Sequence, residues 1–110
     1  MLETKIFDLA IEQSVLAALI TVAASYSEIE NLLTDADFYS TRHKLIFNAV
    51  AALDAKNSPY DAVLVNDWLK SHDMSEQAGG EQYLMQILQD APSSFYNLIP
   101  YAEKLKDFTA

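Results

Sequence analysis

The 110-residue chain contains no cysteine, two glycines, three prolines and few basic side chains. Without cysteine, a disulfide framework, a thiolate zinc site and a cysteine nucleophile are excluded. The two glycines are adjacent, and so few backbone breaks argue against an all-β fold with many turns. The apolar share of 51% is too high for a disordered chain. We therefore expect residues 1–110 to form a single domain with its own core.

The charge balance disfavours strong binding to nucleic acid by this segment. Lysine and arginine number 7 against 16 acidic residues, the net charge is −9, and the basic residues are scattered. Because affinity for phosphates comes largely from basic side chains, the domain should repel a nucleic acid at low salt. The longest apolar stretch, residues 15–24, is about half of the ~20 residues that a membrane span needs. The N-terminus has no signal-peptide pattern, so we expect no membrane contact and a cytoplasmic protein.

Hydrophobic periodicity predicts an all-α fold, a compact globular domain of six helices with short connections. The expected helices span residues 8–22, 28–33, 41–56, 62–71, 81–90 and the segment from about 98 onward. The first is apolar nearly all round, which is typical of a central helix or of one that uses its second face for a partner. Phe38 and Tyr39, in the turn over residues 34–40, are expected to plug the core.

Local signals predict where several helices begin. Ser27 followed by Glu30 has the pattern of a capping box for the second helix. Asp61 and Asn97 are the expected N-caps of the fourth and sixth helices. The glycines at 79–80 break the chain before the fifth helix.

No motif for nucleotide, metal or acyl chemistry is present. A phosphate loop needs several glycines followed by Lys-Ser or Lys-Thr, and Gly79-Gly80-Glu81 has neither the spacing nor the lysine. Asp35 and Asp37 lack the further ligands of a calcium loop, so we interpret them as solvated turn residues. No serine stands in a Gly-x-Ser-x-Gly elbow. We expect no catalytic, cofactor-binding or metal-binding residue here.

The two histidines, His43 and His72, do not form a helical zinc pair, because neither has a second histidine one turn away. We interpret His43 as a partly buried packing residue hydrogen-bonded to a loop, and His72 as an exposed helix end. Taken alone, these residues indicate an acidic helical module for contact with other proteins.

Five short stretches occur in a specific order from about residue 9 to residue 105. They are Ile11-Glu12-Gln13-Ser14-Val15-Leu16; Asp37-Phe38-Tyr39 with His43 and Ile46-Phe47; Ser58-Pro59-Tyr60-Asp61; Gly79-Gly80-Glu81-Gln82-Tyr83-Leu84; and Ala91-Pro92-Ser93-Ser94 with Asn97 and Tyr101-Ala102. In this order they resemble the N-terminal domain of DnaB-type replicative DNA helicases. The chain departs from the family pattern at Ala17, where glycine is usual, and at Tyr60, where an aliphatic residue is usual.

The resemblance implies a place in a collar tier that is stacked on a ring of ATPase motors. In that family the collar assembles as a trimer of dimers, supports the hexamer and receives primase. The resemblance also implies that the motor, with its ATP and Mg²⁺, and a helical hairpin follow after Ala110 in a longer protein. The implied partners are primase, other helicase subunits and a helicase loader, within bacterial or phage replication.

We therefore expect this segment to act by binding rather than by catalysis. The candidate partner-interface residues are Tyr83, near the Gly-Gly helix start, and Phe95 and Tyr96 in the last loop, with a place in the core as the alternative for each. A different class of function is a stand-alone acidic adaptor or inhibitor, for instance phage-encoded, that binds primase or helicase. A Gly-rich loop ending in Lys-Thr or Lys-Ser further along the reading frame would exclude it. A small enzyme is a third hypothesis, but no paired acid and base is evident.

Overall fold

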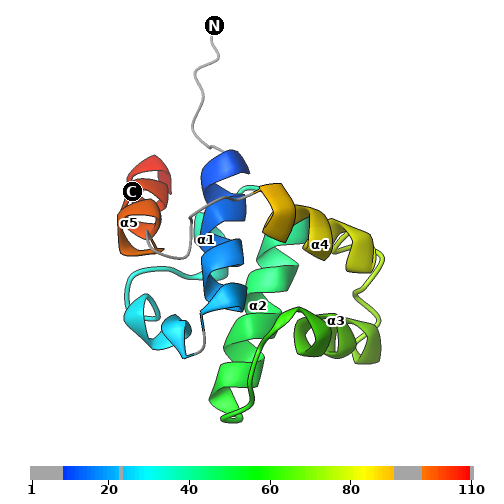
Figure 1. The fold of residues 1–110 in the computed structure, drawn as a ribbon. Helices are drawn as coiled ribbons and strands as arrows, with labels where there is room; N and C mark the ends of the chain where they lie inside the picture. Colours follow the sequence, from blue (N-terminus) through cyan, green and yellow to red (C-terminus); the bar gives the residue numbers. More distant parts are fainter. Residues whose placement is uncertain (1–8, 23, 91–97, 110) are drawn as a thin grey trace, which may run out of the picture.

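The computed structural model describes residues 9–22, 24–90 and 98–109, which form helices and their connections with no β-strand among them. The expectation of an all-α fold is therefore confirmed, but the described residues contain five α-helices and not six. They are α1 (Leu9–Thr21), α2 (Thr41–Ala55), α3 (Ala62–Ser71), α4 (Gly80–Asp90) and α5 (Leu98–Thr109), as Figure 1 shows. Two short 3₁₀ helices, η1 (Ser25–Glu28) and η2 (Asp35–Asp37), lie between α1 and α2.

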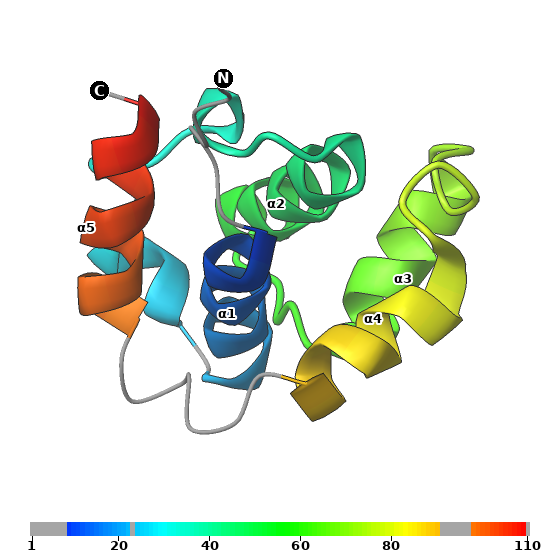
Figure 2. The same ribbon diagram turned by 90° about the horizontal axis from the view of Figure 1, so that it is seen from above.

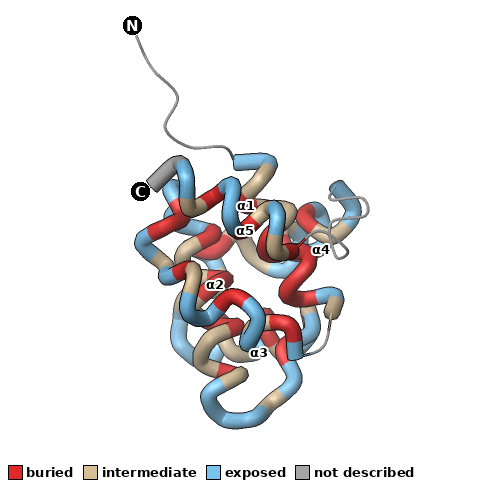
Figure 3. Tube along the Cα trace, turned by 90° about the vertical axis from the view of Figure 1, so that its left-hand side faces the viewer, coloured by how far each residue is buried: buried red, intermediate tan, exposed pale blue. Residues whose placement is uncertain are grey.

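Helix α1 is the centre of the fold. It packs against α5 on one side and against α2 and α4 on the other, and α3 covers α2 and α4 (Figures 1 and 2). Every side chain from Val15 to Ile20 is at most 7% exposed. The continuous apolar run thus gives a helix that is covered on all sides, as its pattern predicts. Buried and exposed positions alternate along the other helices, as the colours of Figure 3 show.

The predicted helix over residues 28–33 is wrong, and so is its capping box. Residues Ser25–Glu28 form one turn of 3₁₀ helix, which follows Ala24 in a left-handed conformation with φ 61°. The hydroxyl of Ser27 donates to the carbonyl of Ala24 at 3.2 Å and does not cap a helix. A six-residue α-helix is marginal because nucleation costs more than so few hydrogen bonds return. Successive turns, rather than an α-helix, bury the side chains of Ile29 and Leu33.

A capping box does exist in this connection, at Thr34 and Asp37. The backbone N–H of Thr34 donates to the Asp37 carboxylate at 2.8 Å, and the Thr34 hydroxyl accepts from the N–H of Ala36 at 3.3 Å. Asp37 is 3% exposed and lies 3.3 Å from the ammonium group of Lys106 on α5. The interpretation of Asp37 as a solvated turn residue is therefore wrong. It closes the turn and joins it to α5.

The other predicted boundaries agree closely with the structure. Helix α3 covers the expected residues, and the Asp61 carboxylate caps it by accepting from the N–H of Leu64 at 3.0 Å. Phe38 is buried as expected, but Tyr39 is 60% exposed and does not plug the core. The predicted N-cap at Asn97 lies outside the described residues.

Candidate protein-interaction site

The most organised polar feature of the molecule is a buried network on Glu12 of α1, His43 of α2 and Tyr83 of α4. Glu12 is 0% exposed and His43 is 1% exposed. The His43 Nδ1 lies 2.7 Å from a Glu12 carboxylate oxygen, and its Nε2 lies 2.6 Å from the Tyr83 hydroxyl. The amide of Gln13 donates to the same hydroxyl at 3.2 Å. One chain of hydrogen bonds therefore connects three helices.

The distances are consistent with the following set of hydrogen bonds, in which every member of the network has a partner. Because a carboxylate only accepts, the Nδ1–H of His43 donates to Glu12. The Nε2 of a neutral imidazole then accepts from the Tyr83 hydroxyl, whose oxygen in turn accepts from Gln13. Such fully connected buried networks favour one packing arrangement, because any shift leaves a polar group without a partner.

Glu12 also holds the segment that leads into α2. Its carboxylate accepts the backbone N–H of Tyr39 at 2.7 Å and that of Ser40 at 3.3 Å. These amides directly precede the helix, so the carboxylate fixes the position at which the chain enters it. The buried charge is thus compensated by two amide dipoles and one imidazole N–H, as a buried carboxylate requires.

The two glycines where α4 begins allow Tyr83 to reach the network. Both have positive φ, +97° at Gly79 and +74° at Gly80, and a Cβ at Gly79 would lie 2.6 Å from the Cβ of Tyr83. The glycine at 79 is therefore required by close packing against Tyr83. No lysine follows, so the residues do not fit a nucleotide phosphate.

The charged group of Arg42 lies over the ring of Tyr83. The guanidinium carbon of Arg42 lies 4.7 Å from the centre of the ring, within the range of a cation–π contact. Arg42 is exposed and Tyr83 is half-buried. We call these two residues the Arg42 face. It presents the residue types that are enriched at protein interfaces, on a support fixed by buried hydrogen bonds.

The predicted site residues have different outcomes. Tyr83 is half-buried, with its hydroxyl bonded to His43 in the interior and its ring beside Arg42, and its place at a partner interface stays a prediction. Phe95 and Tyr96 lie outside the described residues. His43 is fully buried and bonded to side chains, so its predicted bond to a loop is wrong. His72 is an exposed helix end, as expected.

Sequence reasoning missed Glu12, although it lies in the first of the quoted stretches. A glutamate within an otherwise apolar helix was the available signal, because such a residue needs a buried partner. The structure does bring an acid and a base together here. Both are shielded from solvent, however, which suits a structural network rather than a reaction with a substrate.

Within residues 9–22, 24–90 and 98–109, no cluster of three or more histidine or acidic side chains could hold a metal ion. No helix in those ranges is both long enough and apolar enough to cross a bilayer.

Comparison with known proteins places this arrangement in a family. The family model described as "DnaB-like helicase N terminal domain" matches residues 4–107. The chain belongs to this family. The residues that form the buried network come from the Glu-Gln, Asp-Phe-Tyr, His and Gly-Gly-x-x-Tyr stretches that the DnaB-like N-terminal domain pattern contains. These separate stretches therefore meet in one place in the fold.

Individual relatives agree with this assignment. The replicative DNA helicase DnaB of Pasteurella multocida is 31% identical over 96 residues, which cover 87% of this chain and 20% of that protein. The replicative DNA helicase DnaC of Bacillus subtilis is also 31% identical over 96 residues, 87% of this chain and 21% of that protein. The chain thus spans about a fifth of the length of these relatives.

A solved structure has the same fold. The crystal structure of the N-terminal domain of DnaB helicase from Mycobacterium tuberculosis superimposes with a TM-score of 0.87 at 28% identity. The match covers 93% of this chain and 72% of that one. The helical arrangement described above is therefore that of a DnaB-like N-terminal domain.

Proposed function

We propose that this chain is the protein-binding N-terminal domain of a replicative DNA helicase, which supports a hexamer collar and docks primase. The observation that carries the proposal is the family match over residues 4–107, together with relatives that are replicative helicases. In this proposal ATP and Mg²⁺ act in a motor domain outside these residues. The segment itself needs no cofactor, and it works in the cytoplasm as part of a replication complex.

The collar role fits the chemistry of this segment. A net charge of −9 disfavours a grip on DNA, so contacts to the nucleic acid are assigned to other parts of the parent protein. Neighbouring helicase subunits are the partners in a trimer of dimers, and a helicase loader is a further one. Several copies held in one ring would present several docking sites, which raises the local concentration of a partner without requiring a tight single contact.

The Arg42 face is our candidate for the docking of primase. Arginine and tyrosine are over-represented among residues that dominate binding energy, particularly where they lie on a rigid support. Arg42 and Tyr83 form such a pair above the Glu12–His43 network.

The test is to mix the purified chain with the C-terminal domain of the cognate primase and to measure the mass of the complex by light scattering. We expect a complex at tens of micromolar protein. Absence of a complex at that concentration would contradict docking by this segment. The collar role is tested separately, by the native mass of the parent protein with and without residues 1–110, and we expect the hexamer to be weakened by the deletion.

A further inference from the structure

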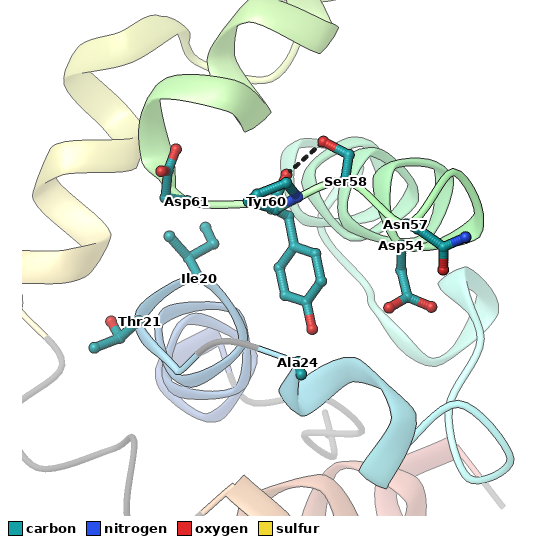
Figure 4. A pocket seen from close by; sticks show the side chains of 9 residues that line it. Ile20, Thr21, Ala24, Asp54, Asn57, Ser58, Tyr60 and Asp61 are labelled. Atoms are coloured by element: carbon teal, nitrogen blue, oxygen red, sulfur yellow. Dashed lines mark hydrogen bonds between the residues drawn. The ribbon is translucent and has the colours of Figure 1, made fainter.

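A pocket opens at the opposite end of the α1–α2 pair from the buried network. Its lining comes from the last turn of α1, from Ala24, from the last turn of α2 and from the connection over residues 57–61 (Figure 4). Its volume is about 460 Å³, within the range of ligand pockets and sufficient for a long side chain. Glu12 and Ile20 are eight positions apart on α1, which corresponds to about 12 Å along a helix. The pocket and the Arg42 face are therefore different places.

One side of the pocket is apolar and held in place. Ile20 and Pro59 contribute aliphatic surface, and Tyr60 stands between Ile20 and Asp54 in Figure 4. Tyr60 is 5% exposed, and its hydroxyl accepts the backbone N–H of Tyr26 at 2.8 Å. This bond fixes the Tyr60 ring as a wall of the pocket.

The polar side of the pocket is acidic. Asp54 and Asp61 both line it, and neither carboxylate forms an ion pair with any lysine or arginine of the described residues. Asp61 caps α3, whereas the half-buried carboxylate of Asp54 has no hydrogen bond to another residue in the described ranges. Asp54 is therefore available to an incoming cation.

A second observation places negative potential at this end of the molecule. Burial, together with the carboxylates of Glu30 and Asp54, raises the pKa of the neighbouring Tyr26 hydroxyl above its ordinary value. The net charge of −9 extends the attraction for a basic partner over longer distances.

We propose that this pocket receives an arginine side chain from a protein partner, with the aliphatic stem against Ile20 and Pro59 and the guanidinium on Asp54. Arginine fits because its stem is apolar while its head carries a charge that is weakly hydrated. Its planar fork can donate two hydrogen bonds to one carboxylate, which the compact ammonium of lysine matches less well. The proposal does not depend on which surface docks primase.

The experiment is an NMR titration of the ¹⁵N-labelled chain with end-blocked Gly-Arg-Gly, Gly-Lys-Gly and Gly-citrulline-Gly peptides. We expect the arginine peptide to shift amides of residues 20–24 and 54–61 and to bind more tightly than the lysine peptide. Citrulline has nearly the same shape without the charge, so its peptide should bind at least about threefold more weakly. Equal binding of the citrulline or lysine peptide, or shifts confined to other residues, would overturn the proposal.

Two variants test whether the peptide arginine binds to the carboxylate of Asp54. Asp54→Asn keeps the size of the side chain and should weaken arginine binding by about threefold. Glu76→Gln, at an exposed position that does not line the pocket, should leave binding unchanged. A dispersed amide spectrum of each variant verifies the fold. Wild-type affinity in a folded Asp54→Asn variant would overturn the proposal.

Discussion

The Nδ1 of His43 lies 2.7 Å from a carboxylate oxygen of Glu12, and both side chains are withdrawn from solvent. This contact joins the first turns of α1 and α2, and the Tyr83 hydroxyl on the other ring nitrogen extends it to α4. The orientation of α4, and with it the Arg42 face, therefore depends on a buried polar contact as well as on apolar packing. A charge at this depth is tolerated only while its partners remain in place.

Replacing Glu12 by glutamine should destabilise the domain by about 2–4 kcal/mol. The neutral amide loses a charge-assisted bond, and its N–H₂ group must face either the N–H of Tyr39 or the N–H groups of Ser40 and His43. The measurement is the free energy of unfolding in urea. Glu76→Gln, at an exposed position, is the matched control and should change it by less than about 0.5 kcal/mol. Equal effects of the two substitutions would show that the network contributes nothing to stability.

The two adjacent glycines should respond differently to alanine. Both have positive φ, so each alanine costs roughly 1 kcal/mol of backbone strain. At Gly79 the new Cβ would also collide with Tyr83 at 2.6 Å, whereas at Gly80 nothing lies within 4 Å. We expect Gly79→Ala to lower the thermal midpoint clearly more than Gly80→Ala. The reverse order, or equal shifts, would contradict the packing role of Gly79.

The stability of the domain should fall above about pH 10, partly through Tyr26. Burial and the carboxylates of Glu30 and Asp54 raise the pKa of this phenol above 10.0. The unfolded chain then loses the proton first, so the contribution of Tyr26 is complete below pH 10 and is lost as pH rises through the folded-state pKa. Urea midpoints between pH 8 and pH 11 should decline less steeply in Tyr26→Phe than in the wild type. Tyr39→Phe, at a side chain that is 60% exposed, should decline as the wild type does, and parallel curves for all three would be inconsistent with this account.

The helices were predictable where local chemistry specifies them. Helix α3 was expected over its observed residues because a capping aspartate, Asp61, and an apolar stripe define it without reference to the rest of the chain. The segment over residues 28–33 has similar local signals, Ser27 and Glu30, but is too short for helical hydrogen bonding to outweigh nucleation. Its conformation is decided by burial of Ile29 and Leu33, which local patterns do not contain.

The candidate site was predictable only in part, because its contacts are distant in sequence. Tyr83 was singled out from its aromatic character beside two glycines, yet its partner His43 lies 40 residues away. Glu12 and His43 are separated by 31 residues, and nothing in the spacing of either residue indicates that they pair. The stretches that carry the family resemblance contain these residues, but neither Glu12 nor His43 was predicted to belong to the site. The fold explains why these stretches are found in one sequence, because it brings Glu12, His43 and Tyr83 into contact.

The most direct test of the central claim, that this domain works by recognising proteins, is a calorimetric titration with the C-terminal domain of the cognate primase. We predict a dissociation constant of tens of micromolar or tighter for the wild type. We expect binding about tenfold weaker for Arg42→Ala, because an arginine anchor contributes about 1–2 kcal/mol, and unchanged for Lys70→Ala on α3. No detectable binding by the folded wild-type chain, or equal affinities of the Arg42→Ala and Lys70→Ala variants, would contradict docking through the Arg42 face.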